Sequence, residues 1–237
     1  MSLTAIWACP PSRDPALAGN SEHATARRGA PPACSAVAIT IVAATIKEHE
    51  IICAGVLRSI ALFRQCKLET PDRVRIVVAN VPLKIGGISA FAVYEANTKT
   101  IHLANMKTFA AAAKSIKEFG ALPIDALYES VVAHEVAHRI FRPLVKNMDL
   151  SHATHEYVAY AAQVSAMPRA VRRQYLQSIE RPPPTDLSLF VDIVLLLGPA
   201  RFAAMAYDHF SAPGNGCRIL QGVAAGSIEF PTMEEFD

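Results

Sequence analysis

The sequence predicts an α+β fold in a single domain. Segments with strand-like patterns come first, and segments with the apolar period of helices follow them. The composition agrees, because 51% of the 237 residues are apolar and 19% are charged, which is enough to fill one sizeable core. The net charge of +2, from 23 basic and 21 acidic side chains, gives no electrostatic basis for binding nucleic acid.

Residues 1–35 are expected to form a disordered leader or a targeting segment, and residues 36–230 the domain. The apolar run 35–46 follows the basic pair Arg27 and Arg28, as in a signal peptide, but it lies unusually far from the first residue. A first strand of the domain is therefore the favoured interpretation. A signal would place the protein in the periplasm or outside the cell, and its absence in the cytoplasm. No segment reaches the roughly 18 apolar residues of a membrane span.

The first half of the domain is expected to supply the sheet. Residues 36–43 form a β-branched apolar run, and residues 73–81 alternate before they become fully apolar. Residues 88–94 and 100–103 flank a short polar turn and predict a hairpin. Between the first two strands, residues 47–67 carry apolar side chains at helical spacing. The result is a small mixed or antiparallel sheet with one helix inserted.

From residue 107 onward the pattern is helical. A long helix is expected to start with Pro123 in its first turn and to end before Pro143, because proline cannot continue a helix interior. Further helices are expected at 155–166, 168–179, 186–197, 199–210 and 217–225. The segment 188–197 is apolar enough to predict a buried helix.

The five cysteines do not predict a zinc site, because no two have C-x-x-C spacing. Cys53 and Cys66 are expected on one helix about 20 Å apart, so they cannot form a disulfide with each other. Because their number is odd, the cysteines leave the redox compartment open.

The strongest functional signal is the segment 134–138, which spells H-E-x-x-H inside a predicted helix. Residues four apart share one helix face, so His134 and His138 present two imidazoles to one point, as a tetrahedral zinc ion requires. Glu135 is rotated by about 100° and can reach a water at the metal as general base. Only about 0.015 such matches are expected by chance with 8 His and 13 Glu in the chain.

A catalytic zinc site needs a third protein ligand and an open fourth position. The break at Pro143 and a short connector let the chain return, so Glu156, near the start of the next helix, is the favoured third ligand. His155 is the rival ligand, and His209 is a more distant candidate. His152 is also a candidate by residue type, but it is expected to be a loop residue.

This layout resembles the gluzincins, zinc metallopeptidases with H-E-x-x-H on one helix and a glutamate ligand on the next. The resemblance covers residues 88–165. It implies a helical zincin core with one zinc ion per chain, held by His134, His138 and Glu156, and a water activated by Glu135. The layout also resembles a group of small uncharacterised bacterial proteins, which brings no known activity.

The same resemblance implies a sheet beside the active-site helix, whose edge strand binds an extended peptide; Thr100–Leu103 is expected there. It also implies a Tyr or His on a later helix that stabilises the oxyanion, for which His209 and Tyr207 are candidates. Thermolysin-like enzymes carry an Asp where this chain has Tyr160. A zinc histidine therefore needs another polar partner, such as Gln163 or a backbone carbonyl.

These features together predict a zinc-dependent hydrolase that cleaves peptide bonds. An endopeptidase is favoured, because the chain lacks the N-terminal-amine anchor motif of aminopeptidases. The alternative is a zinc-binding domain with weak or no catalytic activity and a binding or structural role. The expected partner is a peptide or protein substrate, with no nucleic acid and no integral membrane span.

Overall fold

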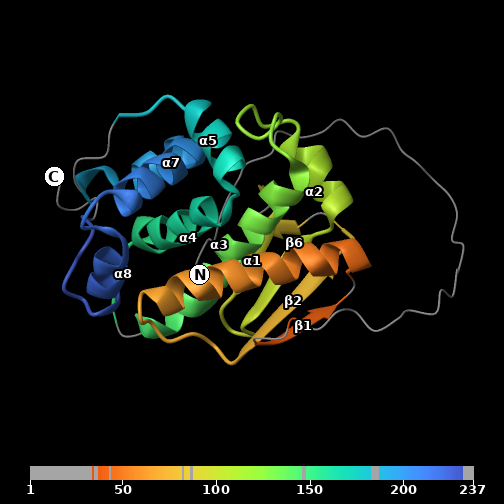
Figure 1. The fold of residues 1–237 in the computed structure, drawn as a ribbon, viewed down its shortest axis with the longest axis horizontal. Coiled ribbons are helices and arrows are strands. Elements are labelled where there is room, and N and C mark those ends of the chain that lie inside the picture. Colours follow the sequence, from red (N-terminus) through yellow and green to blue (C-terminus); the bar gives the residue numbers. More distant parts are fainter. Residues whose placement is uncertain are drawn as a thin grey trace, which may run out of the picture.

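The computed structural model describes most of the predicted domain and, of the predicted leader, only Cys34. The described residues are 34, 37–42, 44–81, 83–85, 88–145, 148–182 and 187–231. Within them the chain forms helices α1 to α8, one short 3-10 helix and strands β1 to β6, which confirms the α+β class (Figure 1). None of the helices in these residues is long and apolar enough to cross a membrane.

Four strands form a mixed sheet in the order β1-β2-β6-β5. Strands β1, β2 and β6 are parallel, and β5 is antiparallel to β6. Strands β3 and β4 form a separate hairpin. The strands are β1 (Ala38–Val42), β2 (Arg73–Ala79), β3 (Leu83–Ile85), β4 (Ile88–Ala90), β5 (Ala92–Glu95) and β6 (Thr100–Ala104).

Two strand predictions were wrong. The single strand predicted over 88–94 is divided into β4 and β5 at Phe91, whose ring packs against that of Phe109 at 4.8 Å between centroids. Thr100–Leu103 is not at an edge, because β6 pairs with β2 on one side and β5 on the other. The inner position of β6 buries Ile101 and Leu103 completely. The edge strand beside β6 is therefore β5, and β1 forms the opposite edge.

Helix α1 (Ile46–Gln65) is the crossover that parallel strands β1 and β2 require. It begins at a capping box, in which Thr45 Oγ1 accepts a hydrogen bond from the Glu48 backbone and Glu48 accepts one from the Thr45 backbone. The other oxygen of Glu48 accepts from the Met106 N–H at 2.7 Å, at the start of α2 (Met106–Ala113). One buried carboxylate thus joins two helix starts.

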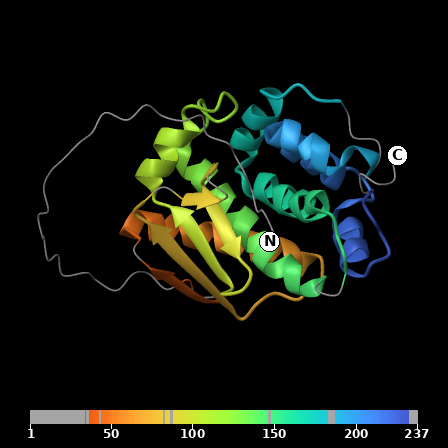
Figure 2. The same ribbon diagram turned by 180° about the vertical axis from the view of Figure 1, so that it is seen from behind.

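The helix that carries the H-E-x-x-H segment is α3 (Ile124–Leu144). It packs against α1, α4 (His152–Ala166), β5 and β6. The hydroxyl of Tyr128 donates to the carbonyl of Ala104 at 2.9 Å, which fixes α3 at the end of β6. Figure 2 shows the strands in front of α1 and α3, so these helices cover one face of the sheet.

Helix α3 includes Pro143, although it was expected to end before that residue. A proline in the last turn removes one hydrogen bond and leaves the preceding turns intact, so the helix ends just after it. Helix α4 begins at His152, three residues earlier than predicted, because Ser151 caps it by accepting from the Thr154 N–H. His152 is therefore helical and not a loop residue.

The remaining helices lie beside α4 on the side away from the sheet (Figure 1). They are α5 (Arg169–Gln177), α6 (Asp192–Leu197), α7 (Pro199–Ser211) and α8 (Gly216–Ala224), with a 3-10 turn at Leu187–Leu189. The helix predicted at 186–197 is reduced to α6, and residues 183–186 lie outside the described residues. Its buried character was also wrong, because Leu196 and Leu197 are 67% and 82% exposed.

Two disulfides cross-link the domain. Cys34 is bonded to Cys53, and Cys66 is bonded to Cys217, so Cys53 and Cys66 are not bonded to each other, as predicted. The second bond joins the end of α1 to the start of α8 across 151 residues of sequence. Cys9 lies outside the described residues.

The contact between α1 and α3 leaves no room for a side chain at Gly55. A Cβ placed there would lie 2.5 Å from the carbonyl oxygen of Glu129 and 2.8 Å from the Cβ of Val132. We expect Gly55→Ala to lower the free energy of unfolding by about 1–3 kcal/mol through overpacking, measured by urea denaturation. Gly120→Ala is the control, because its nearest neighbour is at 3.4 Å. Equal stability of the two variants would contradict this close packing.

Candidate metal centre

The H-E-x-x-H side chains lie in the interior of the domain. His134, Glu135 and His138 are all buried on α3, as the apolar flanks of the motif predicted. The Nε2 atoms of His134 and His138 lie 3.1 Å apart, as expected for residues one helical turn apart. Buried polar groups at this density need a partner of opposite charge or a bound ion.

Glu156 supplies that partner from α4. One of its oxygens, Oε2, lies 3.4 Å from His134 Nε2, and the other, Oε1, lies 3.2 Å from His138 Nε2. The donor atoms of the three residues all lie within 4.8 Å of one another. The structure therefore brings together the three residues that the sequence predicted as metal ligands.

The separations fit a tetrahedral metal site. Zinc binds histidine nitrogen and carboxylate oxygen at about 2.0–2.1 Å, so two ligand atoms of an ideal tetrahedron lie about 3.3 Å apart. The three measured separations are 3.1, 3.2 and 3.4 Å. Two imidazoles and one carboxylate are also a donor set that zinc uses in catalytic sites. The residues present therefore fit a zinc ion in donor type and in spacing.

Burial and charge act in opposite directions on the ligands. Burial alone would raise the pKa of Glu156, but the imidazoles of His138 and His134 hold it well below its usual range. Burial alone would lower the pKa of His134, but its contacts with Glu156 raise it. Burial lowers the pKa of His138. The carboxylate is thus charged and ready to bind a cation.

Glu135 faces the sheet. Among the described residues, neither of its oxygens accepts a hydrogen bond of good geometry, and the nearest donor is the backbone N–H of Tyr94. Burial raises its pKa to about 7, against a smaller lowering effect of the Tyr94 backbone N–H. Tyr94 belongs to β5, an edge strand. The carbonyl of Phe91 bonds to β6, and backbone groups along a strand alternate in direction. The N–H and carbonyl of Tyr94, three residues further on, therefore face away from β6. Glu135 therefore lies beside the outer edge of the sheet.

Two side chains of α4 lie beside the ring of His134. The ring of Tyr160 meets the His134 ring edge-on, with 4.6 Å between centroids. The buried side chain of Gln163, one turn further along α4, is a polar neighbour that helps to raise the pKa of His134. This is the position that the sequence suggested for a partner of a zinc histidine.

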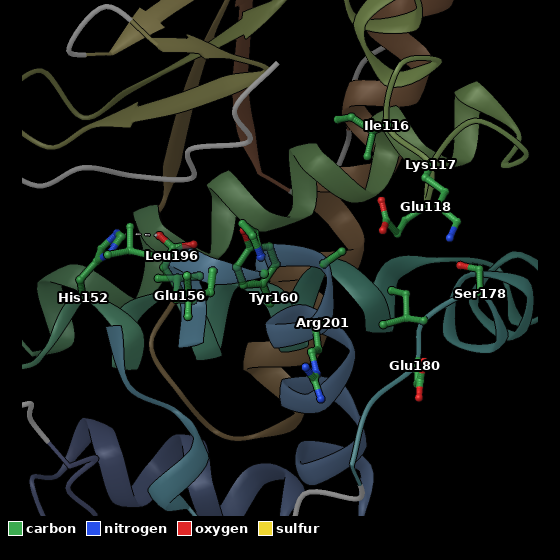
Figure 3. A pocket seen from close by; sticks show the side chains of 16 residues that line it. Ile116, Lys117, Glu118, His152, Glu156, Tyr160, Ser178, Glu180, Leu196 and Arg201 are labelled. Carbon is green, nitrogen blue, oxygen red and sulfur yellow. Dashed lines mark ion pairs between the residues drawn. The ribbon is translucent and has the colours of Figure 1, made fainter. Parts of the chain in front are cut away.

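A pocket of about 860 Å³ opens beside the site (Figure 3). Near the metal ligands its wall is formed by His152, Glu156, Tyr160 and Leu196, and Ile116, Glu118 and Ser178 lie further away. Three consecutive leucines of α6, Leu195 to Leu197, contribute an apolar wall. Of the three predicted ligands, Glu156 alone is among the residues that line it.

The predicted oxyanion donors lie elsewhere in the described structure. His209 Nδ1 is 2.7 Å from the hydroxyl of Tyr157, in a cluster of aromatic rings, and Tyr207 lies under the guanidinium of Arg172 at 5.2 Å. Neither residue lines the pocket beside Glu156. Their role in catalysis stays a prediction that these contacts do not support.

The rival ligand His155 does not join the metal-ligand group. Its ring packs edge-on against Phe141, and burial lowers its pKa to about 4. The sequence offered His152 as a candidate and set it aside as a loop residue, although its Nε2 lies 3.4 Å from Glu156 Oε1. The spacing of four residues between His152 and Glu156 was visible in the sequence. It had no weight because His152 was assigned to a loop.

The geometry predicts that the wild-type protein binds about one zinc ion per chain and that Glu156→Ala lowers its affinity more than about 100-fold. Loss of a direct ligand exceeds the 10- to 100-fold effect typical of residues behind the ligands. Affinity is measured by competition with a chromophoric chelator.

His155→Ala is the matched control, since it removes a neighbouring histidine of the same helix that is not in the metal-ligand group. We expect it to bind zinc like the wild type. Wild-type affinity in Glu156→Ala, or a loss confined to His155→Ala, would refute the assignment of the third ligand.

Comparison with known proteins gives a family but no activity. No curated protein and no solved structure matches the chain. One family model matches residues 39–233, which include α3, α4 and every residue that lines the pocket. The candidate metal centre thus lies inside the matched region. The chain belongs to this family, a family of unknown function designated DUF6639.

Proposed function

We propose that this protein is a zinc-dependent hydrolase that cleaves peptide bonds, of the gluzincin type that the sequence resembles. The observation that carries the proposal is the convergence of His134, His138 and Glu156 at separations of 3.1 to 3.4 Å. Glu135 stands next to this group, and its oxygens accept no hydrogen bond of good geometry among the described residues. This combination of three ligands and an uncommitted carboxylate is what metal-assisted hydrolysis requires.

The proposed mechanism assigns each side chain a separate task. Zinc, when bound, polarises the scissile carbonyl and lowers the pKa of the attacking water towards 7. Glu135 accepts a proton from that water and later delivers it to the leaving nitrogen. His134, His138 and Glu156 would bind the zinc ion. Gln163 and Tyr160 of α4 lie beside the ring of His134.

The edge of β5 supports an extended peptide as the substrate. Backbone groups of Tyr94 face away from β6 and towards Glu135. A peptide that paired with this edge would bring its own carbonyls past the general base, by β-augmentation. Strand Ala92–Glu95 therefore replaces Thr100–Leu103 as the proposed peptide-binding edge.

The apolar wall beside the metal ligands supports a substrate with an apolar side chain near the scissile bond. Leu196 lines the pocket next to Glu156, although 67% of it is exposed (Figure 3). Helix α6 is tied to the start of α4 by Asp192, which accepts from the Ala153 N–H at 2.6 Å. The leucine is therefore held over the site by the same residues that begin α4.

The two disulfides favour an oxidising compartment, such as the periplasm or the outside of the cell, where such bonds persist. The proposed activity belongs in that compartment. Protein for the experiments below is therefore best prepared without reductant.

A second function is favoured by the burial of the motif itself. Glu135 is fully buried, and His134 is only 1% exposed. A zinc ion held there without access for a substrate would stabilise the domain and leave it with a binding or structural role. Both functions predict bound zinc, so turnover of a substrate distinguishes them.

We expect Glu135→Gln to keep about one zinc ion per chain and to lose hydrolysis by at least about 100-fold, since the amide cannot accept the proton. Turnover is measured with a library of unstructured peptides, with and without chelator.

Glu129→Gln is the matched control, because it removes a carboxylate of the same helix that pairs with Arg58. It should retain wild-type turnover. Undiminished activity in Glu135→Gln would remove this residue from the mechanism, and a zinc-loaded wild type without turnover would favour the second function.

We expect Leu196→Asp to raise KM about tenfold or more for peptides with apolar residues, and to leave the zinc content unchanged. Burying a leucine against a ligand is worth about 1.5–3 kcal/mol, and about 1.4 kcal/mol corresponds to tenfold. Ile193→Asp is the control, since Ile193 is exposed on the same helix but does not line the pocket. Equal KM values for both variants would argue against contact between Leu196 and substrate.

A further inference from the structure

Three histidines, and not only the two of the motif, converge on the carboxylate of Glu156. The third is His152, the first residue of α4, whose Nε2 lies 3.4 Å from Glu156 Oε1. Figure 3 shows this pair joined by a dashed line at one end of the pocket. The His152 side chain is 31% exposed, whereas that of Glu156 is 1% exposed. His152 therefore lies at the more exposed end of the pocket, next to the buried carboxylate.

The local structure of α4 fixes the backbone that carries this ring. His152 and Glu156 are four residues apart, so they share a face of the helix. On one side of His152, Ser151 caps the helix and contacts Thr154 through its hydroxyl at 2.8 Å. On the other side, the backbone of Ala153 is held by Asp192. The first turn, which would otherwise fray, is thus anchored at both neighbours of His152.

The two oxygens of Glu156 contact different numbers of histidines. Oε2 lies near His134, whereas Oε1 lies near both His138 and His152. His134 and His138 belong to the group of donors that fits a metal ion, and His152 does not. A nitrogen that binds a metal uses its lone pair for the bond and has no proton to donate. Of the three imidazoles, His152 is then the one whose Nε2–H can donate to Glu156.

We propose that His152 is a positioning residue of the metal centre: it donates a hydrogen bond to Glu156 Oε1 and so orients the carboxylate towards the ion. The inference rests on the zinc site of the proposed function, and it does not depend on peptidase activity. Hydrogen bonds to a ligating carboxylate typically change metal affinity by 10- to 100-fold. Helix α4 thus contributes a pair of residues four apart, His152 and Glu156, as α3 contributes His134 and His138.

The test compares His152→Ala, His152→Gln and the wild type in binding Zn²⁺ and Co²⁺ alone. We expect His152→Ala to lower the affinity for both ions by about 10- to 100-fold in competition with a chelator. It should also shift the visible absorption of bound Co²⁺, which reports the ligand geometry. His152→Gln keeps an N–H donor at similar reach, so we expect it to recover most of the affinity and the wild-type spectrum.

Ser151→Ala is the control for a frayed helix start. It removes the N-cap and lowers the melting temperature, but it keeps the imidazole, so we expect affinity within about twofold of the wild type. Wild-type affinity and spectrum in His152→Ala would overturn the inference alone. A loss in His152→Ala that Gln does not recover, with a change in the coordination number of Co²⁺, would make His152 a direct ligand and also overturn it. A wild-type protein that binds neither ion would overturn the proposed function as well.

Discussion

Glu156 is a carboxylate buried in the middle of the domain, and imidazoles from two helices surround it. Taking an ion out of water costs several kcal/mol in real proteins, and only close partners with good geometry offset that penalty. His134 and His138 supply those partners from α3, and His152 supplies a further one from α4. The contact between α3 and α4 therefore holds the polar contacts of the site as well as apolar packing.

The position of α3 is itself determined by the sheet side of the molecule. Gly55 lets α1 approach α3 at backbone contact, and the hydroxyl of Tyr128 holds α3 to the end of β6. Glu48 joins the starts of α1 and α2 through two hydrogen bonds to its oxygens. The histidines of the motif thus lie on a helix with little freedom to shift, which suits a site that needs ligand atoms placed within a few tenths of an ångström.

The two sides of the centre differ in environment. Glu135 faces the outer edge of β5, whereas Glu156 faces the pocket formed by helices α4, α6 and α7. A substrate that spans both sides would meet backbone groups on one side and the leucines of α6 on the other. The apolar exposure of Leu196 and Leu197, unfavourable by itself in water, is consistent with the apolar substrate side chain that we propose.

The sequence alone determined the features that depend on neighbours along the chain. The apolar periods gave the helices and strands of the α+β fold, and the four-residue spacing placed both imidazoles on one face of α3. The choice between His155 and Glu156 was different, because the two are adjacent and point about 100° apart on α4. Which of them reaches the two imidazoles depends on the rotation of α4 against α3, and the sequence favoured Glu156 through the break at Pro143 and the short connector after it.

Tertiary structure alone decided the features that depend on distant partners. The strand order, which made β5 and not Thr100–Leu103 the edge, follows from pairings between segments far apart in the chain. The role of His152 required knowing that Ser151 and Asp192 extend α4 to include it. The disulfide partners of Cys53 and Cys66 also come from distant segments. Periodicity and spacing describe neighbours along the chain, and only packing determines which faces meet.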